Sequence, residues 1–248
     1  MTGKIHIGTS GWSYKHWRER FYPQGLPANA YLDYYAQYFG TTEINTSFYH
    51  LPKPGTVANW MKTVKAKFRF CPKISRYITH VKKLNDPEQT LPRFFDVFKP
   101  FKKKLGPVLI QLPPNLAFNE EKTTHFFSIL KQYKGYHFAF EARHESWFTP
   151  EALSLLRKFK ITFVIADAGK RWPSASELTA RHVYIRFHGK TGYDSLYSTQ
   201  QINSYAKKML LWKQEGHIIW AFFNNDGNAC AIKNALQLIT QTNEKINV

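Results

Sequence analysis

Apolar, strand-like segments alternate with helical segments along the 248-residue chain, and this alternation constrains the fold more than any other feature. Eight strand candidates lie at about residues 4–8, 42–45, 68–73, 108–112, 136–143, 161–167, 182–188 and 218–223. Helical patterns separate most of them, at about 29–39, 56–65, 87–101, 120–133, 151–159, 199–215 and 229–240. No good helix lies in residues 170–181, which we expect to form an irregular crossover. Strands joined through helices run parallel, so the sequence predicts an α/β fold, a (β/α)8 barrel of the TIM type.

We expect a single domain over residues 1–248, with its core from about residue 5 to residue 240. The alternative is an open, doubly wound sheet. No Gly-x-Gly-x-x-Gly turn follows the first strand, where a dinucleotide-binding sheet of that kind would have one. The barrel is therefore favoured.

The strand within Tyr136–Phe148 is followed at once by charged residues. Its Phe138 and Phe140 alternate with Ala139 and Glu141, as in a strand whose two faces differ. Thr149 and Pro150 then give the next helix an N-cap and a proline at its first position. Charged groups at the end of a buried strand need partners or a ligand, so this stretch predicts part of a functional site.

Hydrogen-bonding or charged residues stand at the carboxyl ends of all eight predicted strands, whereas the amino ends have few of them. These residues are Thr9, Ser10, Glu43, Asn45, Lys73, Gln111, Glu141, Arg143, Asp167, Arg186, His188 and Asn224. In a parallel barrel the carboxyl ends of the strands meet at one mouth. We therefore expect a ligand site there, although any one of these groups could instead make only structural hydrogen bonds.

The chain has 35 Lys and Arg against 17 Asp and Glu, a formal net charge of +18. Such an excess favours an anionic partner, either nucleic acid, a phosphorylated metabolite or an anionic surface, although it also serves solubility. Many lysines lie far from the predicted mouth and fit unspecific contacts to a phosphate backbone, namely Lys62, Lys65, Lys67, Lys82, Lys83, Lys99, Lys102, Lys103, Lys104 and Lys158.

Cys71 and Cys230 are too few for a disulfide framework and lie in apolar runs, so we expect two buried free thiols. The first residues lack the apolar core of a signal peptide. The longest apolar run, Ile218–Phe223, is far too short to span a bilayer. The expectation is a cytoplasmic protein without a membrane partner.

Several motifs match a known family in order along nearly the whole chain, from Ile5 to about Leu238. They are Gly8-Thr-Ser-Gly-Trp12, Glu43-Ile-Asn-Thr-Ser-Phe-Tyr49, Lys73 with Ile78-Thr-His80, Leu105-Gly-Pro107, Gln111-Leu-Pro-Pro114, Glu141-Ala-Arg-His144, Ser146-Trp147, Asp167, Arg186-Phe-His-Gly189 and Phe223-Asn-Asn225. This set resembles the YecE-like proteins, an uncharacterised domain family. The resemblance implies a TIM-type barrel, similar in shape to the apurinic endonuclease and xylose isomerase barrels, with a pocket at its mouth. One departure is the charged loop Trp17–Pro23, where relatives usually have a glycine.

Our leading hypothesis is an enzyme, a hydrolase or lyase, that acts on a phosphate-bearing substrate such as DNA or RNA. Glu43, Glu141 and Asp167 are the candidate bases or stabilising carboxylates, and His188 is the candidate acid. Lys73, Arg143 and Arg186 would grip the anion. The remaining candidate ligand-binding residues are His80, His144, Asn45, Gln111, Asn224 and Trp12.

Three alternatives remain open at this point. Lys73 could form a Schiff base in a sugar-phosphate lyase or isomerase. The chain could instead be a non-catalytic binder of nucleic acid or of a metabolite. Glu43, Glu141, Asp167 and histidines could in principle hold a metal ion, but neighbouring cations oppose this, so we expect no metal or other cofactor.

Overall fold

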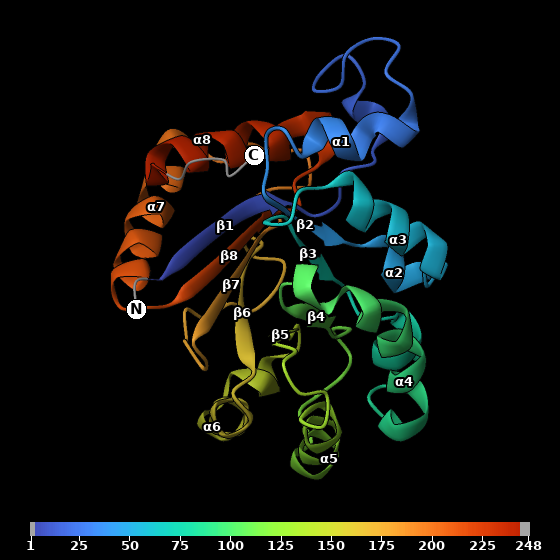
Figure 1. Cartoon of the computed structure of the whole chain (residues 1–248). Coiled ribbons are helices and arrows are strands. Elements are labelled where there is room, and N and C mark those ends of the chain that lie inside the picture. The colour runs from blue at the N-terminus through green and yellow to red at the C-terminus, as the bar shows by residue number, and fades with distance from the viewer. Residues whose placement is uncertain (1–2, 244–248) are drawn as a thin grey trace.

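The computed structural model describes residues 3–243 and contains one sheet of eight parallel strands, in the order β3-β2-β1-β8-β7-β6-β5-β4. Helices surround this sheet on its outside (Figure 1). The strands are β1 (Lys4–Thr9), β2 (Thr41–Ile44), β3 (Arg69–Pro72), β4 (Val108–Gln111), β5 (Phe138–Glu141), β6 (Thr162–Asp167), β7 (His182–Phe187) and β8 (Ile218–Phe223). The predicted (β/α)8 barrel is confirmed, and each strand lies within about two residues of its predicted range.

The barrel closes between β3 and β4, where isolated bridges take the place of a continuous strand pairing. β7 and β8 pair along six consecutive residues. In contrast, isolated bridges join the last seam, at Phe70 with Leu105 and at Lys73 with Leu109. Two backbone hydrogen bonds support them, from Gly106 N to the Phe70 oxygen at 2.8 Å and from Ile74 N to the Leu109 oxygen at 2.8 Å.

The main helices follow the predicted alternation: α1 (Tyr31–Tyr35), α3 (Pro54–Thr63), α4 (Pro87–Phe98), α5 (Glu120–Leu130), α6 (Pro150–Phe159), α7 (Thr199–Gln214) and α8 (Cys230–Thr242). No helix forms in residues 170–181, as expected. The short helical elements that were not predicted include α2 (Thr46–Tyr49) and a π-helical turn at Tyr77–Val81. Both follow strands and lie on the loops of the barrel mouth.

Side chains cap the starts of two helices, and the first of these caps was predicted from the sequence. The Thr149 side chain accepts a hydrogen bond from Ala152 N, with Pro150 at the first helical position of α6. At α7, Ser198 and Gln201 form a reciprocal capping box. These caps fix where each helix begins after its loop.

Apolar side chains form two layers. The larger lies between the sheet and the helices, and includes Ile44, Phe70, Phe140 and Leu156. The smaller fills the middle of the barrel, with Cys71, Leu109, Ala139, Val164, Tyr184, Trp220 and Phe222. Because side chains alternate along a strand, the residue two positions beyond an interior residue also faces the barrel axis. This parity decides which strand-end groups reach the mouth.

Cys71 and Cys230 are buried free thiols, as predicted. Within residues 3–243, no helix is long and apolar enough to cross a membrane.

Candidate active site at the carboxyl end of the barrel

A buried guanidinium joins two carboxylates at the carboxyl end of the strands. Arg186 Nε and one terminal nitrogen donate to the two oxygens of Glu43, each at 2.9 Å. Its other terminal nitrogen donates to Glu141 Oε2 at 2.6 Å. All three residues are at most 1% exposed. Parity explains the meeting. Glu141 and Arg186 follow the interior residues Ala139 and Tyr184 by two positions on their strands, and Glu43 lies beside the interior residue Cys71 of the neighbouring strand.

Two further side chains extend this network. The Tyr184 hydroxyl donates to Glu43 Oε1 at 2.8 Å. His188 Nδ1 lies 3.1 Å from Asn224 Nδ2, and because an amide nitrogen only donates, the ring carries its proton on Nε2. Nε2 faces Glu141 Oε1 at 3.4 Å without the alignment of a hydrogen bond.

Burial and the neighbouring charges shift the pKa values of Glu141, Arg186 and His188. Burial alone would raise the pKa of Glu141, but the charges of Arg186 and Arg143 outweigh burial and hold that pKa well below its usual range. Burial opposes the charge of Arg186, yet Glu43 and Glu141 raise its pKa above its ordinary value. Burial lowers the pKa of His188 in spite of Glu141, so its ring is neutral at pH 7. Glu141 and Arg186 therefore remain charged and stabilise each other.

Lys73 lies beside the network but is not part of the Arg186 bridge. Its Nζ donates to Gln111 Oε1 at 2.7 Å and stands 3.9 Å from the centre of the Phe48 ring. Burial, and next to it the charge of Arg186, lower the pKa of Lys73 to about 7. Lys73 can therefore both accept and donate a proton near neutral pH.

Arg143 is the most accessible cation that contacts the network, with a side chain 14% exposed. It reaches Glu141 Oε1 through two nitrogens, each at 3.3 Å, and its guanidinium lies 4.3 Å from the centre of the Trp172 ring. These long contacts leave Arg143 free to turn toward a ligand. Arg143 thus forms an ion pair with Glu141 and lies at the mouth, where its position along the chain predicted it.

Several buried polar atoms of the described residues have no hydrogen-bond partner. Ser10 Oγ, Asn45 Oδ1, His188 Nε2 and Trp172 Nε1 belong to residues at or beside this network, and the others are Tyr136 Oη, Asn203 Oδ1 and Asn225 Oδ1. Asn45 is held in place by a 3.0 Å bond from its Nδ2 to the Ser10 carbonyl. A buried polar atom without a partner is unfavourable, and a ligand would relieve this.

Not every predicted site residue belongs to this group. Asp167 turns toward the helical layer, where Tyr205 of α7 donates to Oδ2 at 2.7 Å and Lys190 donates to the same oxygen at 2.8 Å. The reason is parity, because Ala166 is the residue that lies beside Arg186 on the neighbouring strand. Asp167 is therefore a structural carboxylate rather than a base of the mouth.

Three aromatic or imidazole candidates have mainly structural contacts. His144 Nδ1 lies 2.9 Å from Ser146 Oγ, at the start of the turn Glu145–Phe148. Trp12 is 8% exposed and packs edge-on against Trp60 and Phe70. His80 contacts Phe48 edge-on, and burial followed by Lys73 lowers its pKa to about 4.

Two expectations are corrected by the structure. Arg186 cannot be the main anion grip, because its nitrogens already bind Glu43 and Glu141. The amino ends of the strands are not poor in polar groups, since His6, Arg69, His137 and His182 line a cavity there. Tyr184 was missed as a network residue, although its alternation with Arg186 and His188 in the sequence was the available signal.

Within residues 3–243, no group of three or more His, Cys, Asp or Glu side chains is arranged to hold a metal ion. The carboxylates that could have served as ligands face Arg186 instead. The prediction of a site without a metal thus stays a prediction, with a donor set that fits a metal poorly.

Comparison with known proteins decides the family. The model of the family described as "Protein of unknown function DUF72" matches residues 6–248. The chain belongs to the DUF72 family. The UPF0759 protein YecE of Escherichia coli K12 is 29% identical over 145 residues, which are 58% of this chain and 50% of that protein. The chain thus spans about half the length of the curated relatives it matches, and the predicted resemblance to YecE-like proteins is confirmed.

Solved structures of DUF72 members have the same barrel. The protein from Thermotoga maritima is 28% identical, with a TM-score of 0.87 over 97% of this chain and 100% of that one. A member from Enterococcus faecalis is 24% identical, with a TM-score of 0.84 over 97% and 96% of the two chains. The more distant SacUVDE, 8% identical, has a TM-score of 0.57 over 98% of this chain and 100% of that one. The last two likenesses bear on the fold alone.

Proposed function

We propose that this DUF72 chain is an enzyme that acts on a phosphate-bearing substrate at the barrel mouth, with nucleic acid as the favoured substrate and hydrolysis or lysis as the reaction. The observation on which this depends is that two cations beside the Arg186 network have contacts that a ligand could replace. Arg143 reaches Glu141 only through two contacts of 3.3 Å, and Lys73 is bonded to the neutral amide of Gln111. A phosphate group would bond with Arg143 in a bidentate manner and favour the charged form of Lys73.

Each residue then has a distinct role in the proposal. Arg143 and Lys73 contact the phosphate, and Asn45 and Gln111 offer amide groups beside it. Arg186 positions the two carboxylates rather than the substrate. Lys73, with a pKa of about 7, transfers the proton in place of His188, whose neutral ring is held between Asn224 and Glu141.

The rim of the mouth has features that suit a nucleic acid. Tyr49 and Tyr77 are 70% and 51% exposed, on the two short helical elements that follow β2 and β3. Phe48 covers Lys73 and contacts Tyr49, so one aromatic side chain near the anion site points into solvent. Exposed rings of this kind stack on unpaired bases, and the exposed Arg76 lies beside Tyr77.

The test measures binding and turnover of a labelled single-stranded oligonucleotide by anisotropy and gel analysis. Arg143→Gln should weaken binding about tenfold, since a charge-assisted bond to phosphate contributes about 1.5–3 kcal/mol. Arg157→Gln is the matched control, because Arg157 is an exposed cation of α6 paired with Glu177. Equal affinities of the wild type and Arg143→Gln would contradict the proposed site.

A second candidate is supported by the lowered pKa of Lys73. A lysine that is partly neutral at pH 7 can attack a carbonyl carbon, as a sugar-phosphate lyase or isomerase requires. Borohydride with an aldose or ketose phosphate should then trap a covalent adduct in the wild type and none in Lys73→Met. Oligonucleotide binding that persists in Glu141→Gln, with no turnover by the wild type, would instead indicate a non-catalytic binder.

A further inference from the structure

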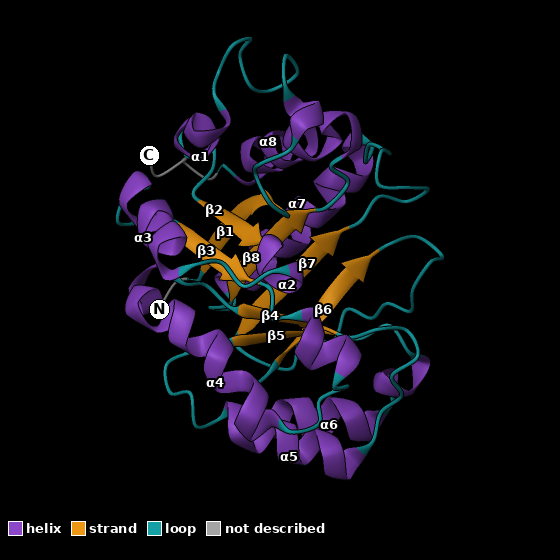
Figure 2. Ribbon diagram, turned by 90° about the vertical axis from the view of Figure 1, so that its right-hand side faces the viewer, coloured by secondary structure: helices purple, strands orange, loops and turns teal. Residues whose placement is uncertain are grey.

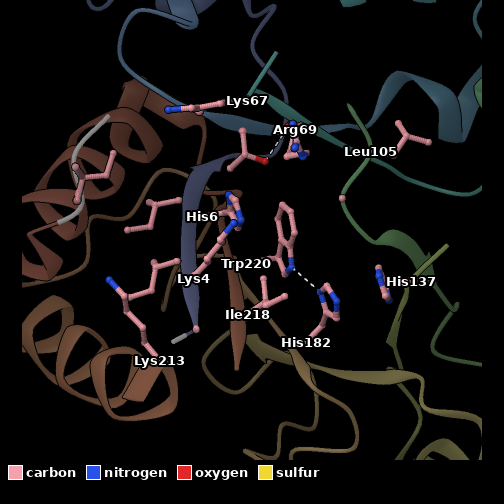
Figure 3. A pocket seen from close by; sticks show the side chains of 17 residues that line it. Lys4, His6, Lys67, Arg69, Leu105, His137, His182, Lys213, Ile218 and Trp220 are labelled. Carbon is pink, nitrogen blue, oxygen red and sulfur yellow. Dashed lines mark hydrogen bonds between the residues drawn. The ribbon is translucent and has the colours of Figure 1, made fainter. Parts of the chain in front are cut away.

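A cavity of about 600 Å³ opens at the amino end of the strands, opposite the proposed active site. Its size is within the range of small-molecule sites. In Figure 3, imidazole, lysine and arginine side chains from several strands and loops surround it. None of the described residues that line it is Asp or Glu, and the basic groups include Lys4, His6, Lys67, Arg69, His137 and His182.

One wall of the cavity is a row of stacked rings (Figure 3). The His6 ring stacks on the Trp220 ring, with centroids 4.1 Å apart. The His182 ring is nearly parallel to the Trp220 ring, with centroids 6.2 Å apart. His137 stacks on His182 at 4.0 Å. Trp220 Nε1 donates to His182 Nδ1 at 2.9 Å, so the neutral His182 ring carries its proton on Nε2, where it is available to donate.

The charge of the cavity comes from its lysines and Arg69 rather than from the imidazoles. Burial, followed by Arg69 and Lys4, lowers the pKa of His6 to about 4. Burial, followed by His137 and Arg181, lowers the pKa of His182 to about 3. These rings are therefore neutral hydrogen-bonding groups at pH 7, set among permanent cations.

The helices add positive charge to the same end of the barrel. In a (β/α)8 barrel each helix runs back toward the amino ends of the strands. The last turns of α3, of the 3-10 segment Lys99–Lys104 and of α6 carry Lys62, Lys102, Lys103, Lys104, Arg157 and Lys158. Such residues also complement the helix dipole, and Lys104 does so by donating to the carbonyls of Met61 and Val64. Their field nevertheless adds to that of the cavity, and a concave site lined by one sign of charge attracts the other.

We propose that this cavity is a second binding site, which takes a small phosphate-bearing polyanion between Arg69, the lysines and the imidazole row. The ligand is held by direct charge and by N–H donors. The indole is 4% exposed and already stacked, so no free ring remains to stack on a base. This site is separate from the proposed reaction at the mouth and does not depend on it.

Gly40 provides a sharp test, because it lines the cavity and a Cβ there would meet nothing within 4 Å. Gly40→Glu would place a carboxylate among the cations. Gly55→Glu is the matched control, since Gly55 also has open space around its Cβ but is exposed on α3. Both variants change the net charge equally.

Isothermal titration of the full chain with inorganic tripolyphosphate should show binding by the wild type. The dissociation constant should rise at least tenfold in Gly40→Glu and less than threefold in Gly55→Glu. The mouth variant Arg143→Gln should retain cavity binding, which separates this site from the proposed active site. Gly40→Gln introduces a neutral side chain of the same size, so comparison with Gly40→Glu separates the effect of charge from that of volume. Weaker tripolyphosphate binding by either Gly40 variant supports the cavity as the binding site.

Melting curves establish that each variant is folded. If Gly40→Glu does not fold, the double variant Lys4→Gln/Lys67→Gln removes two exposed charges of the same cavity and should weaken binding tenfold. Unchanged affinity in these variants would overturn the proposal. The proposal of a small polyanion would also fail if the wild type did not bind tripolyphosphate but bound a DNA duplex, and Gly40→Glu weakened that DNA binding.

Discussion

Arg186 holds two carboxylates in a place from which water is excluded, and each partner depends on the others. A buried carboxylate or guanidinium is stable there only while its counter-charge is present. This explains why the strongest charges of the mouth are also its least accessible. Lys73 and Arg143, which have weaker protein contacts, are the residues left to meet a ligand.

Removal of one carboxylate should therefore be costly. Glu43→Gln breaks the buried ion pair that Glu43 makes with two nitrogens of Arg186 and should lower the free energy of unfolding by about 3–5 kcal/mol in urea titrations. Glu177→Gln breaks an ion pair whose side chains are about half exposed, and it should lower the free energy of unfolding by only about 0–1 kcal/mol. Similar effects of the two substitutions would mean that the network does not have the buried character described.

Lys73 should make stability depend on pH. Its folded-state pKa, about 7, is below the ordinary value of 10.5, so between these values the unfolded chain binds the proton and the folded chain does not. Stability should thus rise with pH, by about 2 kcal/mol between pH 7 and pH 8.5 from this residue. Lys73→Met should flatten the rise. A wild type and variant with parallel stability profiles over this window would contradict the lowered pKa.

For single residues, the sequence predicted which side chains lie at the mouth of the barrel, but not which of them pair with one another. Parity along the strands places Glu43, Lys73, Glu141 and Arg186 at one mouth. Asp167 was misplaced because one position along β6 reverses the direction of a side chain, and β6 is buried on both faces, so hydrophobicity does not reveal its parity. Which cation binds which carboxylate depends on side-chain packing that no spacing rule contains.

Among the elements, the strands and long helices were predictable because each has a clear period and a polar stop. β8 has the predicted bounds, Ile218–Phe223. The short α2 and the turn Tyr77–Val81 were missed because four or five residues are too few to show a helical period. The histidines at the amino ends of β1 and β7 were visible in the sequence, and attention to both ends of each strand would have found them.

The seam between β3 and β4 should be the element most sensitive to added volume. A Cβ at Gly106 would lie 2.6 Å from Cys71 Sγ and 2.7 Å from the Trp220 ring. Gly106→Ala should therefore lower the free energy of unfolding by about 1–3 kcal/mol. Gly55→Ala, on the surface of α3, is the control and should be neutral or slightly stabilising in the same denaturation experiment. Equal stabilities would mean that the seam adapts without strain.

For the whole molecule, the net charge of +18 includes cations at both ends of the barrel, and a separate anionic ligand is proposed for each end. The loops at the mouth carry cations beside the proposed active site, while helix ends carry them around the opposite cavity. The sequence predicted the closed barrel and a set of lysines far from the mouth. It could not show the cavity lined by His6, Arg69 and His182, because these residues come together only through the arrangement of the strands in space (Figure 2).

Nucleic-acid binding, if backbone-led as proposed, should weaken with salt. Between 50 and 200 mM salt the affinity for a DNA oligonucleotide should fall at least about tenfold, because counterions are released from the phosphates. Lys73→Met should lower the slope of log affinity against log salt by about 1. Affinity that is constant over this range would remove the electrostatic argument altogether.

The weak closure between β3 and β4 has a consequence for the mouth above it. Lys73 follows the end of β3 and Gln111 is the last residue of β4. Their 2.7 Å hydrogen bond therefore links the two strands between which the barrel closes. A ligand that draws the Lys73 ammonium away from the Gln111 amide would break this link between β3 and β4. Ligand binding at the mouth and closure of the barrel are thus coupled through a single hydrogen bond.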